Sequence, residues 1–334
     1  MSKNLRILIA LVIVAGIAYW LMSRNSWSTF KGDLKEFAIK DTATITRMFF
    51  ADKRGNKVLL QRNEQKIWMV DNKFIADQDK VNLILSTMHD VEVKNPIAET
   101  EHNSVVSILA TQGIKAEFYA GEKLIKTIYV GSSTPDQVGT YMLVDGSAKP
   151  YVTHINGFVG YLTPRFISKQ KLWKSKQIFN LNANEIKSIS IQYPMDMKQS
   201  FTIENGITPI LRSNNIAMKA DEKFLKYYLG SFRNIFFEGY IESTQAEKDS
   251  VHRLTPFCVI EVIKANGEKI ALQVNVKAID SHTKLHYDDQ GKAMQFDTEK
   301  YFAFINNDSD MVLIQQYVFG KLFKTLDEIL SVKS

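Results

Sequence analysis

The chain has 334 residues, 45% of them hydrophobic and 23% charged, a composition that excludes a disordered chain, a collagen-like fibre and a polytopic membrane protein. Its single cysteine, Cys258, excludes a disulfide framework and a zinc site with several thiolates. The formal net charge is +6, but no long basic run occurs, so nucleic-acid binding has little support and we expect no nucleic-acid partner.

The N-terminal segment carries the clearest signal. Residues 7–22 contain no charge, with Lys3 and Arg6 before them and Arg24 after them. A membrane-spanning helix needs about 20 apolar residues, with a lower limit near 17, and flanking arginines can reach the headgroups. Basic residues ahead of the span favour a cytoplasmic N-terminus. We therefore predict an uncleaved signal anchor whose marker residues are Ile7, Leu11, Val14, Tyr19, Trp20 and Arg24.

Two alternatives to the anchor stay open at this point. One is a cleaved signal peptide, whose best site precedes Tyr19 and would cut inside the apolar block. The other is a cytosolic core helix. No later segment is long enough to span a membrane. The anchor predicts a single-pass protein of the inner (cytoplasmic) membrane, with its N-terminus in the cytoplasm and the bulk of the chain in the periplasm.

The chain after the anchor alternates strand-like and helix-like patterns. In the first half we expect strands over 45–51, 57–62, 67–70, 116–120, 126–130, 140–144 and 151–154. Val81, Ile84, Leu85 and Met88 have the spacing of one helix face, which predicts a helix over 77–89 with Asp77 as its N-cap.

The second half repeats this order of elements. We expect strands over 186–192, 201–204, 210–211, 257–262, 269–274 and 286–287, and a helix over 220–229. Each half is expected to end in a second helical run, over 155–166 and over 311–330. The apolar stripe of the last run is interpreted as a helix that caps its own module, with a partner-binding helix as the alternative.

These patterns predict an α+β fold with two tandem duplicated modules, each a mostly antiparallel sheet with packed helices, after one N-terminal transmembrane helix. The expected parts are a cytoplasmic tip and anchor over 1–24, a tether over 25–40, a first module over 41–180 and a second module over 181–334.

Several scaffold positions in the first half form a recognisable order. They are the run around Trp68, Ala76-Asp77 at a helix start, Gly113-Ile114, Val130-Gly131, Tyr141 and Trp173-Lys174. Over residues 45–191, with a weaker echo afterwards, the chain resembles the bacterial family called domain of unknown function 4340. The resemblance implies an envelope protein with one N-terminal anchor, often accompanying an ABC-type export permease and an auxiliary protein like those of the gliding machinery. It supplies no established catalytic residues.

Candidate chemistry is sparse in this sequence. His282 and His286 could share a metal on a helix, but in the strand expected there they lie about 13 Å apart. Residues 131–135 could cradle an anion, but they are interpreted as a polar hairpin connection. Residues 306–310 have neither the spacing nor the glutamate of a calcium loop. We therefore predict no catalytic residue, no metal and no cofactor, and a core position for Cys258.

Aromatic residues supply the one surface candidate. Phe236, Phe237 and Tyr240 follow the helix expected over 220–229 and could line a groove between the modules that binds a partner or a ligand.

The leading hypothesis is a non-enzymatic, membrane-anchored periplasmic accessory or scaffold subunit of an envelope complex for transport, secretion or gliding. Its expected partners are other envelope proteins, including an ABC-type permease and its auxiliary protein. The alternative is a periplasmic ligand-binding module for a glycan, lipid or peptide that works with an ABC-type exporter.

Overall fold

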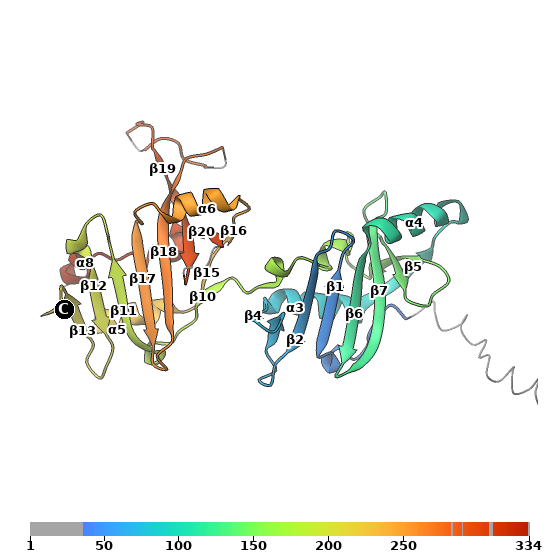
Figure 1. The fold of residues 1–334 in the computed structure, drawn as a ribbon, viewed down its shortest axis with the longest axis horizontal. Helices are drawn as coiled ribbons and strands as arrows, with labels where there is room; N and C mark the ends of the chain where they lie inside the picture. The colour runs from blue at the N-terminus through green and yellow to red at the C-terminus, as the bar shows by residue number, and fades with distance from the viewer. Residues whose placement is uncertain (1–35, 282, 289, 307–309, 333–334) are drawn as a thin grey trace, which may run out of the picture. The chain divides into compact units, whose positions relative to one another are not determined.

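The computed structural model describes residues 36–281, 283–288, 290–306 and 310–332. The chain divides into two compact units, the first ending at Ser175 and the second beginning at Lys176. Each unit contains one nine-stranded sheet in which every pair of neighbouring strands is antiparallel (Figure 1). The chain is therefore an α+β protein built on two antiparallel sheets.

The sheet of the first unit has the strand order β4-β3-β2-β1-β6-β7-β8-β9-β5. Its strands are β1 (Arg47–Ala51), β2 (Lys57–Arg62), β3 (Trp68–Val70), β4 (Phe74–Ile75), β5 (Val91–Pro96), β6 (Ile114–Ala120), β7 (Lys123–Ser133), β8 (Thr140–Val144) and β9 (Tyr151–Ile155). Two helices, α3 (Gln78–Asp90) and α4 (Glu99–Gln112), accompany it, together with the short 3₁₀ helices η2 (Thr42–Thr44), η3 (Thr163–Arg165) and η4 (Gln170–Trp173).

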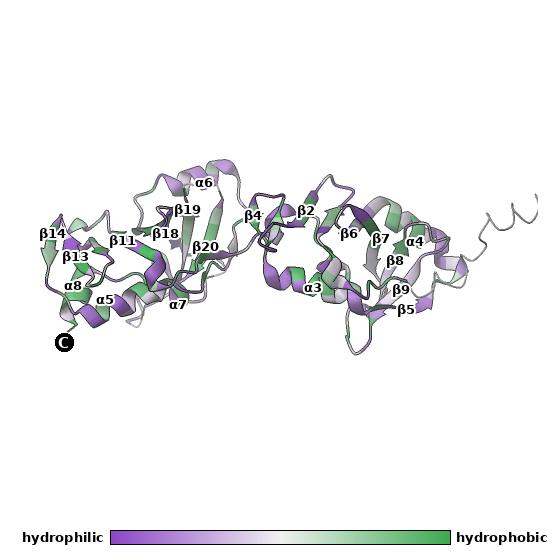
Figure 2. Cartoon of the chain, turned by 90° about the horizontal axis from the view of Figure 1, so that it is seen from below, coloured by the Kyte–Doolittle hydropathy of each residue, from purple (hydrophilic) through white to green (hydrophobic). Residues whose placement is uncertain are grey.

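The two helices of the first unit cover opposite faces of its sheet. Along β8, Met142 packs in the same cluster as the buried residues of α3, whereas Tyr141 packs with Val105 and Leu109 of α4. Since successive strand residues point to opposite faces, α3 and α4 lie on different sides. Polar and apolar residues both occur along α3 (Figure 2), as expected for a helix that buries one face.

The second unit repeats the strand order of the first as β14-β13-β12-β11-β17-β18-β19-β20-β16. The bounds are β11 (Ile186–Gln192), β12 (Phe201–Glu204), β13 (Ile210–Ser213), β14 (Ile216–Met218), β16 (Gly239–Tyr240), β17 (Cys258–Lys264), β18 (Lys269–Ala278), β19 (Phe296–Ile305) and β20 (Met311–Gln315). A separate ribbon pairs β10 (Gln177–Phe179) with β15 (Ile235–Phe236). The helices are α5 (Glu222–Leu229), α6 (Gln245–His252), α7 (Gln316–Phe319) and α8 (Leu326–Ser331), with 3₁₀ helices η5 (Ala183–Glu185), η6 (Met197–Gln199) and η7 (Gly230–Phe232).

The corresponding helices enter at corresponding points of the two units. α3 follows β4 as α5 follows β14, and α4 precedes β6 as α6 precedes β17. The buried residues of α5, which include Leu225 and Tyr228, pack in the core of the second sheet. The order of elements thus repeats from one unit to the other.

Several predicted elements are confirmed at their boundaries. The strands expected over 57–62, 140–144, 186–192 and 201–204 have those limits. Asp77 caps α3, because its side chain accepts a hydrogen bond from the Lys80 backbone N–H at 3.3 Å.

The helical run predicted over 155–166 is wrong. These residues end β9 and continue as turns and the short η3, because Gly157 and Gly160 adopt positive φ angles of 78° and 145° that a helix does not contain. The run predicted over 311–330 is confirmed only in part: it begins as β20, and the two short helices α7 and α8 follow and pack on the core of their own unit. The strand expected over 286–287 is also wrong: Tyr287 forms only an isolated bridge with Ala293, and β19 occupies that place in the order.

Candidate functional site

A largely apolar concavity on the second unit has a volume of about 690 Å³. We call it the apolar hollow. It lies where the connection from β11 to β12 meets the segment between α6 and β17, the facing ends of β18 and β19, and the residues before α8. Its lining consists of Tyr193, Met195, Asp196, Gln199, Leu254, Thr255, Pro256, Phe257, Val276, Phe296, Phe323 and Thr325.

An aromatic cluster supports the floor of the apolar hollow. The Phe257 ring stacks on Tyr301 with centroids 5.4 Å apart and meets Phe323 edge to face, also at 5.4 Å. Tyr193 meets the same Phe257 ring at 5.9 Å, and its hydroxyl donates a hydrogen bond of 3.0 Å to the Lys324 carbonyl oxygen. These contacts fix the floor before any partner or ligand binds.

Large apolar side chains form the open rim of the hollow. The side chains of Met195, Leu254 and Phe296 are 78%, 54% and 48% exposed. Single exposed apolar residues are common on proteins, but three that converge on one concave surface are typical of a binding site. Methionine adapts to irregular partners, because its side chain is flexible and polarisable.

The ionisable groups beneath the hollow are held neutral. Burial raises the pKa of Tyr193 and of Cys258 far above their ordinary values. Cys258 is buried and is therefore a core residue, as predicted. A thiol whose pKa is raised in this way is a poor nucleophile. The hollow therefore suits the binding of apolar groups.

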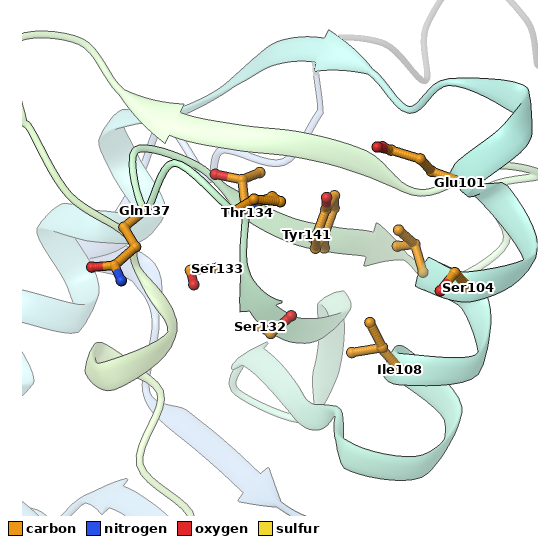
Figure 3. Close-up of a pocket in the computed structure, with 10 residues that line it drawn as sticks. Glu101, Ser104, Ile108, Ser132, Ser133, Thr134, Gln137 and Tyr141 are labelled. Atoms are coloured by element: carbon orange, nitrogen blue, oxygen red, sulfur yellow. The ribbon is translucent and has the colours of Figure 1, made fainter.

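A second concavity, which we call the polar hollow, lies on the first unit (Figure 3) and has a volume of about 340 Å³. One wall is α4 and the other is the end of β7 with its connection to β8. Its lining consists of Glu101, Ser104, Val105, Ile108, Ser132, Ser133, Thr134, Pro135, Gln137 and Tyr141. Of the segment 131–135, the first three residues end β7, and the expected hairpin connection begins at Thr134, whose N–H donates to the Gly139 carbonyl oxygen at 3.0 Å.

The predicted aromatic surface residues have unequal environments. Phe237 is buried and meets Tyr240 edge to face at 5.0 Å, whereas Phe236 is 45% exposed at the end of β15. Tyr240 packs against the core of the second unit. None of the three lines the apolar hollow, and the groove expected for them stays a prediction.

The predicted anchor residues Ile7, Leu11, Val14, Tyr19, Trp20 and Arg24 lie outside the described residues. Within the part of the chain that the structure describes, no helix is long and apolar enough to cross a membrane. Likewise, residues 36–281, 283–288, 290–306 and 310–332 contain no group of three or more histidine, cysteine, aspartate or glutamate side chains that could hold a metal ion. His282, one member of the histidine pair considered above, is also outside the described residues.

One buried ion pair lies near the apolar hollow, between β18 and β19. The Lys277 ammonium is 3.4 Å from an Asp297 carboxylate oxygen and 2.9 Å from Asp280. Asp297 also accepts hydrogen bonds from the Thr283 hydroxyl and from the backbone N–H groups of Glu299 and Lys300. The cluster ties both ends of the long connection over 279–295 to the sheet.

Comparison with known families gives one match. The model of the family described as Domain of unknown function (DUF4340) matches residues 68–256, from β3 to the segment just before β17. The chain belongs to this family. The match begins later than the range of 45–191 expected from the sequence motifs, continues past its end, and covers parts of both units. No curated protein and no solved structure matches the chain.

The rim residues of the apolar hollow were missed by the sequence reasoning. Met195 and Phe296 lie in or beside connections, where no strand or helix periodicity marks their direction. The available signal was compositional: Met195 and Met197 interrupt an otherwise polar loop. Exposed apolar residues in a loop are functional candidates, because loops carry a large share of the binding residues of proteins.

Proposed function

We propose that this DUF4340 protein is a non-enzymatic accessory subunit of an envelope complex, and that its apolar hollow binds apolar side chains of a partner protein. Residues 7–22 would anchor it in the inner membrane, with both units in the periplasm. The partner we propose is an ABC-type export permease or its auxiliary protein, as the family resemblance implies. We further propose that the two units arose by internal duplication, which the repeated strand order supports.

The apolar hollow is the observation that carries the proposal. Its exposed rim of Met195, Leu254 and Phe296 surrounds a rigid aromatic floor, which is the arrangement of a pocket for one or two anchor side chains. The polar residues Asp196, Gln199 and Thr255 stand among the lining residues. An apolar centre with polar groups around it is typical of protein interfaces.

In-cell photo-crosslinking tests this docking surface. A photoreactive amino acid would replace Met195 in the hollow and, as a matched control, Ile207, which is 98% exposed on the connection between β12 and β13 of the same unit. We expect position 195 to crosslink a permease or its auxiliary protein in intact cells and position 207 not to do so. Equal crosslinking from both positions, or none from 195, would contradict the proposal.

The membrane anchor has a separate test. We expect protease added to spheroplasts to degrade both units, and fractionation to place the full-length chain with the inner membrane. Recovery of the full-length chain in the cytosol, or its protection from external protease, would rule out the anchored periplasmic location. Neither result depends on which partner occupies the hollow.

A further inference from the structure

The polar hollow of the first unit has two walls that are held close together. Gly131 on β7 lets α4 approach, since a Cβ atom there would lie 3.1 Å from Leu109 Cδ2 and 3.2 Å from the Tyr141 carbonyl oxygen. The Thr163 hydroxyl donates a hydrogen bond of 2.7 Å to the Gly131 carbonyl oxygen from the other side. The hollow is therefore formed by packed elements and is present before any ligand binds.

Tyr141 places an unpaired hydroxyl group in this hollow. The residue is only 7% exposed, and its ring packs with Val105 and Leu109. No hydrogen bond joins its hydroxyl to another described residue, although it lines the hollow between α4 and the hairpin (Figure 3). Burial and the nearby carboxylates of Glu101 and Asp136 raise its pKa, so the group is a neutral phenol. The hydroxyl oxygen itself reaches solvent through the open hollow, where it can exchange a water molecule for a hydrogen bond to a ligand.

The other lining groups restrict the chemistry of that ligand. Glu101 supplies one carboxylate, Gln137 an amide, and Ser104, Ser132, Ser133 and Thr134 supply hydroxyls, while the lining contains no lysine, arginine or histidine. A carboxylate without a cation in the lining disfavours phosphate and other anions. Hydroxyl, amide and carboxylate groups together hydrogen-bond neutral polyols well.

Apolar residues complete the recognition surface. Val105 and Ile108 of α4 contribute to the lining beside these polar groups. A sugar ring presents hydroxyl groups along its edge and C–H groups on its faces, so it matches a hollow with both kinds of wall. The volume of about 340 Å³ is near the lower end of the ~300–1,000 Å³ typical of small-molecule sites, which fits one or two sugar rings.

We propose that the polar hollow binds a neutral mono- or disaccharide, with Tyr141 and Glu101 hydrogen-bonding its hydroxyl groups and Val105 and Ile108 contacting a C–H face. The site lies on the first unit and does not involve the apolar hollow. It therefore goes beyond the accessory role proposed above and stands or fails separately from partner docking.

Saturation-transfer NMR on the full-length chain tests the proposal, in a detergent without a sugar headgroup so that the detergent cannot compete. The probes are glucose, N-acetylglucosamine, cellobiose and chitobiose, with inorganic phosphate as the anionic comparison. We expect at least one sugar to bind with a dissociation constant of about 1 mM or tighter, and phosphate not to bind. Tyr141→Phe, which removes only the hydroxyl, is expected to weaken binding about tenfold.

Two further variants separate recognition from folding. Glu101→Gln changes a solvent-accessible residue on α4. We expect it to weaken sugar binding about three- to tenfold without lowering the melting temperature. Tyr129→Phe is the matched control, because the Tyr129 hydroxyl bonds Asp145 at 3.4 Å outside the hollow, and it should bind like the unmodified chain. Absence of sugar binding up to about 10 mM, equal affinity in Tyr141→Phe, or binding of phosphate instead would overturn the proposal.

Discussion

The two units share one strand order but carry hollows of opposite chemistry. In the first unit the connection between β1 and β2 covers only 52–56, and Asp52 closes it by accepting bonds from the Arg54 and Asn56 N–H groups and the Ser168 hydroxyl. The corresponding connection of the second unit covers 193–200 and supplies Tyr193 and Met195 to the apolar hollow.

The same contrast holds at the next pair of strands. The connection from β7 to β8 covers 134–139, whereas the one from β18 to β19 covers 279–295 and, apart from residues 282 and 289, extends beyond α6 in Figure 1. Phe296 stands at the end of that longer connection and joins the rim of the apolar hollow. The sheet therefore sets a common frame, and the lengths of its connections decide which side chains meet on it.

The helices on the second face of each sheet differ in how they are held. α4 has 14 residues and packs through Val105 and Leu109. α6 has 8 residues, none of them buried. Asn275 donates to the carbonyl oxygens of Val251 and Leu254, Gln273 donates to that of His252, and the His252 ring meets buried Phe304 edge to face at 4.7 Å. Apolar packing therefore dominates the attachment of α4, whereas amide hydrogen bonds contribute much of the attachment of α6.

The largest predicted effect concerns the ion pair that closes the long connection in the second unit. Lys277→Met would leave the Asp297 carboxylate buried without its cation, and we expect it to lower the free energy of unfolding of this unit by about 3–5 kcal/mol. Thermal or denaturant unfolding, followed separately for the two units, measures the effect.

The control for this prediction is the double variant Lys277→Met with Asp297→Asn. Asparagine removes the charge but keeps an oxygen that can accept from the N–H groups of Glu299 and Lys300. We expect it to recover most of the lost stability. A double variant no more stable than Lys277→Met would show that the charge pair is not the cause.

The next prediction compares the two helix attachments directly. Leu109→Ala in the first unit removes buried apolar volume and is expected to cost about 2–5 kcal/mol. Asn275→Ala in the second unit removes hydrogen bonds to the end of α6 and is expected to cost about 1–3 kcal/mol. Hydrogen exchange should show faster opening of α4 and of α6, respectively. A larger cost for Asn275→Ala than for Leu109→Ala, or faster opening of the other unit's helix, would contradict the contrast.

The smallest predicted effect is a pH dependence at the start of α8. Burial alone would raise the pKa of Glu328, but hydrogen bonds from the Thr325 N–H and hydroxyl and from Lys324 hold it below its ordinary value. A carboxyl group with a lowered folded-state pKa stabilises the protein above its unfolded pKa, and that stability is lost as the pH falls through the folded pKa.

We expect Glu328→Gln to remove this acid-side loss while changing stability at pH 7 by less than about 1 kcal/mol, because the side chain is half exposed. Unfolding curves of the two chains between about pH 7 and pH 3 measure it. An unchanged pH dependence in Glu328→Gln would show that the capping carboxylate does not contribute.

Short strands and one capped helix could be predicted from sequence because their signals are local. The strands over 57–62 and 140–144 lie between turn residues, and Asp77 marks the start of α3. α4 was not predicted, since its N-cap residue Ala98 makes no side-chain cap and only Val105 and Leu109 are buried. Residues 311–315 form a strand although their apolar spacing also fits a helix, because pairing with β19 decides the outcome.

The hollows could not be predicted from sequence. The apolar hollow combines Met195, Leu254 and Phe296, which are far apart along the chain and meet only through the sheet order. The polar residues of 131–135 are visible in the sequence, but no local signal predicts α4, which forms the opposite wall of the polar hollow. The family could be recognised from the sequence, because the motifs that mark it are short local patterns at strand ends, turns and helix starts.

Co-purification of the full-length chain in mild detergent tests the central claim most directly. We predict that the unmodified chain and Ile207→Asp retain a permease or its auxiliary protein, and that Leu254→Asp, which places a charge on the rim of the apolar hollow, loses it while both units stay folded. Isolation of the unmodified chain as a free monomer under every mild condition, or full retention of the partner by Leu254→Asp, would contradict the account.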